Sequence, residues 1–325
     1  MNILYGPLYS RRLGISLGLD IIPYKTCSYN CIYCHEGETT FLTLDRKEFF
    51  PLENVLHQLS TLKGKRIVKG RPVDYITFAG SGEPTLDVNI GSYINYLKDN
   101  CPIPVAVITN SSLLWDEKVR QDIRGADLVV PSLDAVTEDS FQMINRPVPH
   151  LSLEKVLQGL VDFCEVFQGA VWLEILLCEG INDSFEDLER FAVLLKNLPV
   201  QKIQLNTVSR PPAESWVRPS SLQTLSQWKD LLGARVTVVE DAVNSTRKSM
   251  EEALRRKVAV LLQKRSYTLE EIQRELHKSG HEVIKVLARM EKEGLVERTL
   301  KNGKSVFYGN KGRIMGNGAP TKPSY

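Results

Sequence analysis

The chain has 325 residues, of which 25% are charged and 42% are hydrophobic. This composition is that of a globular protein and excludes disorder as the main state. The length suffices for one large domain and a smaller one. No apolar run approaches the roughly 20 residues of a membrane span, and the N-terminus lacks the basic and apolar segments of a signal peptide. A cytoplasmic protein is therefore expected.

The net charge of +2 hides an asymmetry between the two parts of the chain. Residues 247–325 carry 18 Lys and Arg against 9 Asp and Glu, whereas residues 1–246 carry 23 against 30. This split predicts two modules, with a polyanion as the partner of the basic one.

Up to residue 245, short β-branched runs alternate with amphipathic stretches. Strands are predicted at 15–22, 73–79, 104–109, 127–132, 170–177 and 201–206. Helices are predicted at 52–62, 88–99, 115–124, 152–167 and 184–197. The alternation indicates parallel strands with crossover helices. Six such units predict an α/β fold, a partial (β/α)6 barrel over residues 1–245, with ligands at the C-terminal ends of its strands.

The end of this first module is less regular. A helix near 222–232 and a strand near 235–240 are expected to complete the core. The Pro-rich stretch 207–221 cannot form a regular element and is expected to cross the open mouth of the barrel.

Residues 246–309 form the second predicted module. A helix is expected at about 249–264, and capping boxes at 268–271 and 279–282 start two more helices. Asn302-Gly303 is a strong hairpin-turn signal between two short strands. Three helices and a hairpin resemble a winged helix-turn-helix. The tail 310–325, rich in Gly, Pro and Lys, is predicted to be disordered.

Three cysteines form the most informative motif of the chain. Cys27, Cys31 and Cys34 stand in the run Thr-Cys-Ser-Tyr-Asn-Cys-Ile-Tyr-Cys. Three thiolates within eight residues can hold one compact metal centre. A [4Fe–4S] cluster normally takes four Cys ligands, and the next Cys is Cys101, so one iron would be left for a ligand that the chain does not supply.

The cysteines also allow other interpretations. A zinc site closed by His35 would also use four nitrogen and sulfur ligands. The irregular set of cysteines does not predict disulfides. Cys101, Cys164 and Cys178 are scattered and are expected to pack in the core.

A Gly-rich turn follows the second predicted strand. It consists of Gly80, Ser81, Gly82 and Glu83. Glycines there would let the backbone approach a small ligand closely, and the Glu83 carboxylate could receive an ammonium group. Together, the Cys triplet and this turn resemble the radical S-adenosylmethionine (SAM) superfamily. That resemblance implies that SAM chelates the open iron through its amino and carboxylate groups, with the 80–83 turn binding the methionine amino group.

The resemblance also implies further SAM contacts at strand ends. The backbone of Tyr33 would contact the adenine, and the ribose and carboxylate would be held by Asn110, Ser132 and Asp134. Glu174, Gln204 and Asn206 lie at later strands and either join this site or cap the following helices. No catalytic residue is predicted beyond these ligands.

Three segments resemble one branch of the superfamily. They are residues 6–14, the Asn-Arg-Pro of 145–147, and 204–212. This branch comprises Fe–S oxidoreductase-type proteins related to wyosine-base tRNA-modifying enzymes. No Cys precedes Cys27, which makes the four-demethyl wyosine reaction, with its second cluster, doubtful. The guanidinium groups that could bind carboxylates or phosphates, or form structural ion pairs, belong to Arg11, Arg12, Arg146 and Arg210.

The second module carries a candidate nucleic-acid face. His281, Lys285 and Arg289 recur every four residues and so share one helix face, while Ile284, Leu287 and Met290 are expected to pack inward. Lys301 and Lys304 flank the predicted hairpin turn and could contact phosphates. The pattern is typical of a recognition helix with a basic wing. The alternative is a protein-binding module whose Lys and Arg are merely solvated.

These features predict a radical SAM enzyme. It would cleave SAM reductively to a 5′-deoxyadenosyl radical, receive electrons from a flavodoxin or ferredoxin-type donor, and modify RNA, with tRNA as the leading candidate. Two alternatives stay open: a protein- or peptide-modifying radical SAM enzyme, and a DNA-binding regulator that senses SAM and the cluster.

Overall fold

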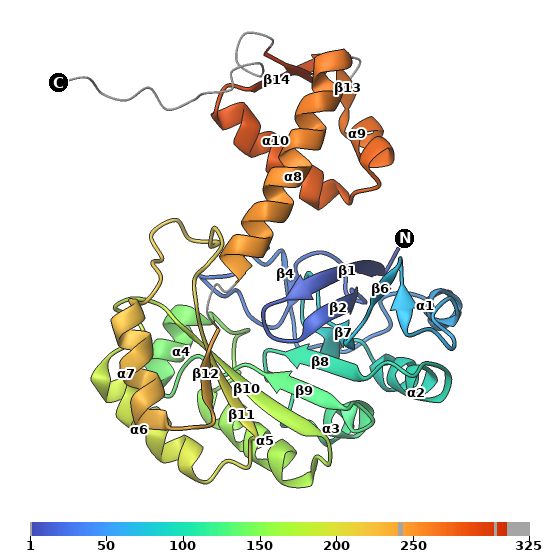
Figure 1. Cartoon of the computed structure of the whole chain (residues 1–325). Coiled ribbons are helices and arrows are strands. Elements are labelled where there is room, and N and C mark those ends of the chain that lie inside the picture. Colours follow the sequence, from blue (N-terminus) through green and yellow to red (C-terminus); the bar gives the residue numbers. More distant parts are fainter. Residues whose placement is uncertain (1, 240–242, 302–303, 311–325) are drawn as a thin grey trace, which may run out of the picture. The chain divides into compact units, whose positions relative to one another are not determined.

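The computed structural model describes residues 2–239, 243–301 and 304–310 (Figure 1). Among them, eight strands form one sheet with the order β1-β2-β7-β8-β9-β10-β11-β12. Their bounds are β1 Leu4–Ser10, β2 Gly14–Leu19, β7 Tyr75–Phe78, β8 Val105–Thr109, β9 Leu128–Pro131, β10 Ala170–Leu177, β11 Lys202–Thr207 and β12 Val236–Val238. β1 pairs antiparallel with β2, and every later pair is parallel. The result is an open, mostly parallel α/β sheet, as predicted.

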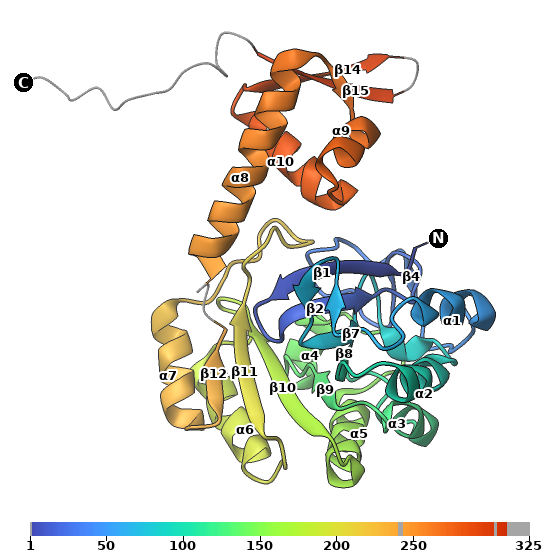
Figure 2. The same cartoon turned by 45° about the vertical axis from the view of Figure 1, so that its right-hand side comes forward.

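Helices connect the parallel strands and lie along the outer side of the curved sheet (Figures 1 and 2). Their bounds are α1 Leu52–Ser60, α2 Ile90–Asn100, α3 Glu117–Ile123, α4 Glu138–Ile144, α5 Leu153–Val166, α6 Phe185–Lys196 and α7 Leu222–Leu232. Strand residues alternate between the two faces of the sheet. Val105 and Val107 of β8 therefore join the large core under the helices, whereas Ala106 joins a small cluster on the inner face.

The six parallel strands from β2 to β11 were predicted from the sequence, whereas β1 was not. β1 contains Gly6 and Pro7, which interrupt the pattern of a strand. Proline lacks a backbone donor and is tolerated mainly on edge strands, and β1 lies at the edge of the sheet. The seven-residue helix α4 was also not predicted. Other short elements that escaped prediction are β3 Thr26–Cys27, β4 Phe41–Leu42, β5 Ile67–Val68, β6 Arg71–Pro72 and the 3-10 turn η1 Pro84–Leu86.

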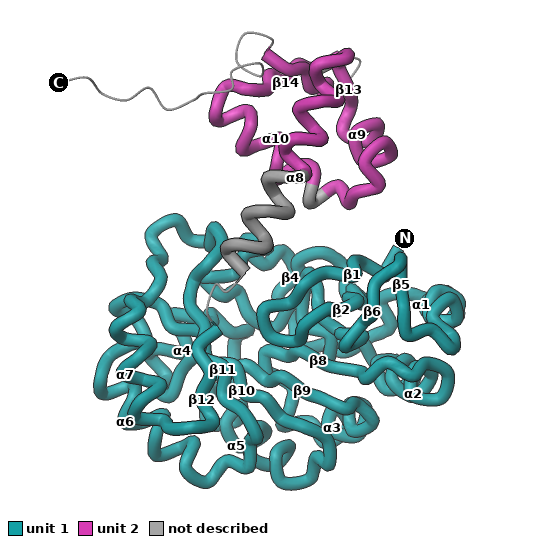
Figure 3. Tube along the Cα trace, viewed as in Figure 1, with its two compact units in different colours: residues 1–240 teal, residues 241–325 magenta. Residues whose placement is uncertain are grey.

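The chain forms two compact units, residues 1–240 and 241–325 (Figure 3). Unit 2 contains α8 Val243–Lys264, β13 Tyr267–Thr268, α9 Leu269–Leu276, α10 Gly280–Lys292, β14 Val296–Lys301 and β15 Lys304–Gly309. Its strands form an antiparallel sheet with the order β13-β15-β14. The three predicted helices and the hairpin are present, and β13 was not foreseen. The predicted disordered tail from residue 311 lies outside the described residues.

Unit 2 has its own core, and α10 contributes to it with a different set of residues than predicted. Val283, Val286, Leu287 and Met290 are buried against α8 and α9, but Ile284 is 50% exposed. The expectation that Ile284 packs inward was wrong, because the apolar stripe of α10 follows the i, i+3, i+4, i+7 spacing from Val283. In the part of the chain that the structure describes, no helix is both long and apolar enough to cross a membrane.

The packing of α5 on the segment before α3 depends on the absence of a side chain at Gly159. A Cβ at Gly159 would lie 2.2 Å from the backbone nitrogen of Trp115. On the same helix, the Lys155 ammonium lies over the Trp115 ring, 3.4 Å from its centroid. Glycine costs about 1 kcal/mol in a helix interior relative to Ala. Gly159 therefore weakens α5 slightly but allows the helix to contact the Trp115 backbone closely.

We therefore expect Gly159→Ala to destabilise unit 1 although Ala favours helices. Overpacking typically costs about 1–3 kcal/mol, which should exceed the helix-propensity gain and lower the free energy of unfolding. Urea unfolding followed by tryptophan fluorescence measures this, because all four Trp lie in unit 1. Gln158→Ala, at the neighbouring exposed position, is the control. A Gly159→Ala protein more stable than wild type would contradict the packing described.

Candidate active site

The Cys loop follows β2 at the C-terminal end of the parallel strands. Cys27 ends the short strand β3, and Cys31 and Cys34 lie in the irregular segment after it. All three cysteines are free and half-buried as residues. The amide of Cys34 donates to the carbonyl oxygen of Cys31 at 3.1 Å, which closes a tight turn between these two residues. The predicted triplet thus lies at the end of the sheet where such folds hold ligands.

The segment after α4 braces one side of the Cys loop. The amide of Asn30 donates to the carbonyl oxygen of Asn145 at 3.0 Å, and the amide of Ile32 donates to that of Ile144 at 3.0 Å. Tyr29 and Pro147 form an isolated antiparallel bridge. The Asn-Arg-Pro run at 145–147, which the sequence analysis noted only as a resemblance, therefore holds the Cys loop through its backbone.

The Gly-rich turn braces the other side. The amide of Lys25 donates to the carbonyl oxygen of Ser81 at 3.0 Å, and the amide of Glu83 donates to that of Thr26 at 3.3 Å. A Cβ at Gly82 would lie 1.9 Å from the Thr26 carbonyl oxygen. At Gly80, a Cβ would lie 2.3 Å from the side chain of Asp20. These glycines are required by the packing of the turn against the protein itself, which is the structural role that a Gly-rich turn after a strand often has.

The carboxylate of Glu83 is buried, at 2% exposure, and ties together the ends of β7 and β8. It accepts hydrogen bonds from the Thr85 amide at 3.1 Å, the Thr85 hydroxyl at 2.6 Å, the Thr109 hydroxyl at 2.7 Å and the Asn110 amide at 2.7 Å. Burial raises the pKa of Glu83, and these donors oppose the rise. Four protein donors thus already use this carboxylate, and its contact with a ligand ammonium stays a prediction.

Asp134, just past β9, is a second buried carboxylate near the Cys loop. It accepts from the Tyr33 hydroxyl at 2.5 Å, the Asn145 side-chain amide at 3.0 Å and the Leu176 backbone amide at 3.0 Å. Burial raises the pKa of Asp134 to about 6. The side chain of Tyr33, whose backbone was predicted to contact the adenine, therefore links the Cys loop to the end of β9. Ser132 lies nearby, and its carbonyl oxygen accepts from the Ser111 hydroxyl at 2.7 Å.

The protein environments of Cys27 and Cys31 disfavour the charged form of these two thiols. Burial, together with the nearby Glu83 carboxylate, raises the pKa of Cys27 to about 11. Burial and Asp134 also raise the pKa of Cys31. Binding of a metal must therefore displace protons from these thiols, because the ligand form is the thiolate.

The N-terminal hairpin reaches the far strands of the sheet. Arg12 forms an ion pair with Glu174 of β10, and Arg11 donates to the Ser209 hydroxyl at 2.5 Å. Asn206 of β11 donates to Glu174 at 2.9 Å. Among the described residues, Gln204 beside Glu174 keeps a buried side-chain oxygen without a hydrogen-bond partner. Buried acceptors are nearly always satisfied, so this oxygen suits a donor group on a bound ligand.

The loop after β11 docks on the Cys loop. The amide of Glu214 donates to the carbonyl oxygen of Ile32 at 3.0 Å, and its carboxylate pairs with Arg146 at 2.5 Å. Arg146 is thus an ion-pair partner in this structure, which was one of the two roles considered for it. The Pro-rich segment lies against the Cys loop, as its predicted course across the barrel mouth requires.

The described side chains do not support the alternative of a zinc site closed by His35. His35 pairs with Glu36 at 2.9 Å. Within the described ranges, no three His, Cys, Asp or Glu side chains are arranged to hold a single metal ion. A cubane does not need that arrangement, because each thiolate binds a different iron. Cys101, Cys164 and Cys178 are buried in the core, as predicted.

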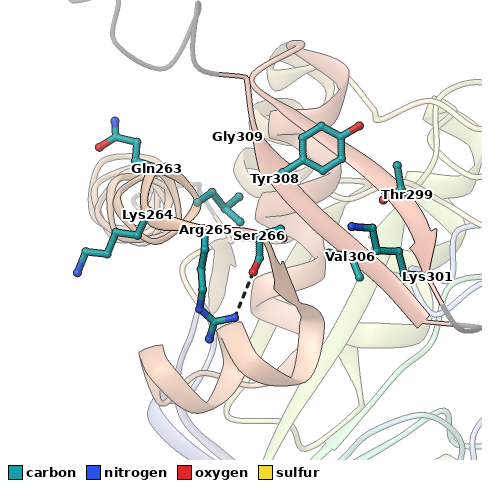
Figure 4. Close-up of a pocket in the computed structure, with 10 residues that line it drawn as sticks. Gln263, Lys264, Arg265, Ser266, Thr299, Lys301, Val306, Tyr308 and Gly309 are labelled. Carbon is teal, nitrogen blue, oxygen red and sulfur yellow. Dashed lines mark hydrogen bonds between the residues drawn. The ribbon is translucent and has the colours of Figure 1, made fainter.

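In unit 2, the predicted nucleic-acid residues are only partly described. Lys285 and Arg289 are exposed on α10, and Arg289 pairs with Glu293 at 3.3 Å. The side chains of His281 and Lys304 lie outside the described residues. Lys301 lines a hollow of about 540 Å³ with Lys264 and Arg265 from the end of α8 (Figure 4). The sequence analysis missed these last two, which lie next to each other at a helix C-terminus.

A known family matches the part of the chain that contains the Cys loop, the Gly-rich turn and Asp134. Residues 21–192 match the family model of the Radical SAM superfamily. The chain belongs to the radical SAM superfamily. Members of this superfamily are enzymes that use a [4Fe–4S] cluster and SAM, so these are the cofactors of this protein.

Some relatives of this radical SAM enzyme are named for an activity, and others are not. A UPF0026 protein of Methanocaldococcus jannaschii is 40% identical over 227 residues, 70% of each chain. The dual-specificity RNA methyltransferase RlmN of Anaeromyxobacter dehalogenans is 26% identical over 66% of this chain and 58% of its own. The crystal structure of a radical SAM methyltransferase from Sphaerobacter thermophilus superposes with a TM-score of 0.52 at 18% identity, over 69% of this chain and 66% of that one. This superposition shows that the two proteins share a fold.

The buried Asp134 should make the stability of the metal-free protein depend on pH. Its folded pKa of about 6 lies above the ordinary value of 3.8. Its favourable contribution is therefore present below about pH 4 and is lost as the pH rises through about 6, a fall of about 2–3 kcal/mol at 1.36 kcal/mol per pKa unit. We expect this fall to be missing in Asp134→Asn. Urea unfolding of both proteins between pH 4 and 7 measures it.

Asp230→Asn, at an exposed site on α7, should keep the wild-type pH dependence. Parallel pH profiles for wild type and Asp134→Asn would show that Asp134 does not bind its proton more tightly in the folded state.

Proposed function

We propose that this radical SAM enzyme modifies RNA, with tRNA as the leading candidate, and that unit 2 is a winged helix-turn-helix module that binds the RNA. The observation that carries the enzymatic part is the Cys loop, which presents three free thiols at the C-terminal end of the sheet and is braced on two sides by backbone hydrogen bonds. The match with RlmN and the basic balance of unit 2 support the choice of RNA.

The residues of the site fit the two cofactors. Cys27, Cys31 and Cys34 would hold the cluster, leaving one iron for SAM. The turn of Gly80, Ser81, Gly82 and Glu83 would receive the methionine end of SAM, and the adenosine would be held by Tyr33, Asn110, Ser132 and Asp134. The unsatisfied oxygen of Gln204, on the neighbouring strands, supports the presence of a ligand with hydroxyl or amino donors.

When bound, the cluster and SAM would supply hydrogen-abstraction chemistry through a 5′-deoxyadenosyl radical. The protein supplies the geometry for this chemistry. Glu83 and Asp134 hold the strand ends and the Cys loop in place before any ligand arrives, through the hydrogen bonds given above. The loop that carries Glu214 is held on the Cys loop by the hydrogen bond from the Glu214 amide to the Ile32 carbonyl oxygen.

Unit 2 offers a basic surface of the kind that contacts phosphates. Figure 4 shows Lys264 and Arg265 at the end of α8 and Lys301 with Tyr308 on the hairpin strands. Lysine and arginine at such a hollow release counterions when phosphates replace them. Tyr308 adds an aromatic ring of the kind on which an unpaired base stacks. The described helix, strand and hairpin order supports the assignment to the winged helix class.

The thiol triplet can be tested by metal content and turnover. Anaerobically reconstituted wild-type protein should hold about four irons per chain and produce 5′-deoxyadenosine from SAM and dithionite. Cys31→Ala should lose the cluster and this product, because no neighbouring thiol replaces it, whereas Cys101→Ala, in the core, should retain both. One zinc in place of iron would overturn the proposal. A bound cluster with no 5′-deoxyadenosine would favour the sensor.

The RNA-binding role can be tested separately on unit 2. We expect the double variant Lys264→Ala/Lys301→Ala to bind total tRNA more weakly, and the slope of log affinity against log salt to fall by about 1 for each phosphate that the variant no longer neutralises. Lys118→Ala/Lys229→Ala, at exposed sites of unit 1, is the charge-matched control. Absence of tRNA affinity in the wild-type protein would favour the peptide-modifying alternative.

A further inference from the structure

Each thiol of the Cys loop receives a side-chain N–H group, and the three donors come from different segments of unit 1. The distances are 3.3 Å from Lys25 Nζ to Cys34 Sγ, 3.4 Å from Asn110 Nδ2 to Cys27 Sγ, and 3.5 Å from Asn145 Nδ2 to Cys31 Sγ. Lys25 precedes β3, Asn110 follows β8, and Asn145 follows α4. Asn110 and Asn145 lie 83 and 114 residues from the cysteines that they contact, which local sequence cannot produce by itself.

Unusual backbone conformations accompany all three donors. Lys25 has a φ of 58°, Ser111 after Asn110 has 69°, and Arg146 after Asn145 has 44°. Non-glycine residues rarely adopt this left-handed region, and they keep it only where the surroundings enforce it. Three of the six such residues in the described part of the chain therefore lie at or directly after a donor to a thiol.

The donors are held in place by other contacts. Lys25 is 2% exposed and Asn145 is 3% exposed. The Asn145 side-chain amide also donates to Asp134 at 3.0 Å, and that of Asn110 donates to the Ser28 hydroxyl at 2.8 Å. A buried ammonium needs an anionic or polar partner, and for Lys25 the sulfur of Cys34 is such a partner.

We propose that Lys25, Asn110 and Asn145 are positioning residues that raise the reduction potential of a cluster held by the three Cys, an inference that rests on the proposed function. One electron from a flavodoxin or ferredoxin-type donor adds negative charge to the cluster and its sulfurs, with no bond formed or broken. N–H donors and a nearby ammonium stabilise that added charge, and hydrogen bonds to sulfur are known to set such potentials. The reduced cluster thus becomes accessible to a weaker donor.

The test is a redox titration of the full-length, anaerobically reconstituted protein, followed through the electron paramagnetic resonance signal of the reduced cluster. Lys25→Met should lower the ratio of reduced to oxidised cluster about tenfold at a fixed potential, which corresponds to a midpoint about 59 mV more negative for a one-electron couple. Asn145→Leu, which keeps the charge of Lys25, should shift the midpoint less and in the same direction. Lys25→Arg should restore a midpoint close to wild type.

Lys118→Met removes the same charge at an exposed site of α3 and should leave the midpoint unchanged. Iron is measured for every variant. Wild-type midpoints in Lys25→Met and Asn145→Leu, with iron intact, overturn this inference and leave the proposed function standing. Loss of iron from both also overturns it, because the donors would then act on assembly rather than on potential. A wild-type protein without a cluster overturns the proposed function, and this inference with it.

Discussion

The site depends on one constraint: an irregular loop must present three sulfurs in a fixed arrangement without a helix or a long strand to shape it. Backbone hydrogen bonds from two neighbours meet this need, from residues 144–146 on one side and from Ser81 and the amide of Glu83 on the other. A third contact comes from Glu214. Because these bonds use main-chain groups, they hold the course of the loop while leaving its thiols free for ligands.

Two buried carboxylates extend this constraint to the strand ends. Glu83 joins the ends of β7 and β8, and Asp134 joins the Cys loop to β9 and β10. Burying a carboxylate costs stability, which is visible in the raised pKa of each. The gain is a polar network whose members fix one another before a ligand binds. The left-handed backbone conformations of Lys25, Ser111 and Arg146 also cost stability.

Much of the fold was predictable because its signals are local. The β-branched runs and amphipathic stretches each report on their own segment. They predict the six parallel strands from β2 to β11 and the helices between these strands except α4. β1 was missed because Gly6 and Pro7 break its pattern, and only its place at the sheet edge makes it a strand. β13 was missed because two residues carry no periodicity; its pairing with β15 defines it. Ile284 was wrongly predicted to be buried, because the apolar face of α10 begins at Val283.

By itself, the sequence determined the chemistry: the spacing of Cys27, Cys31 and Cys34 and the turn at 80–83 name a family, because both are short and contiguous. Tertiary structure alone decided which side chains serve these motifs. Lys25, Asn110 and Asn145 meet the thiols, and Arg12 meets Glu174, across up to 162 residues of chain. A hydrogen bond depends on the distance between two atoms, and folding sets that distance for residues far apart in the chain.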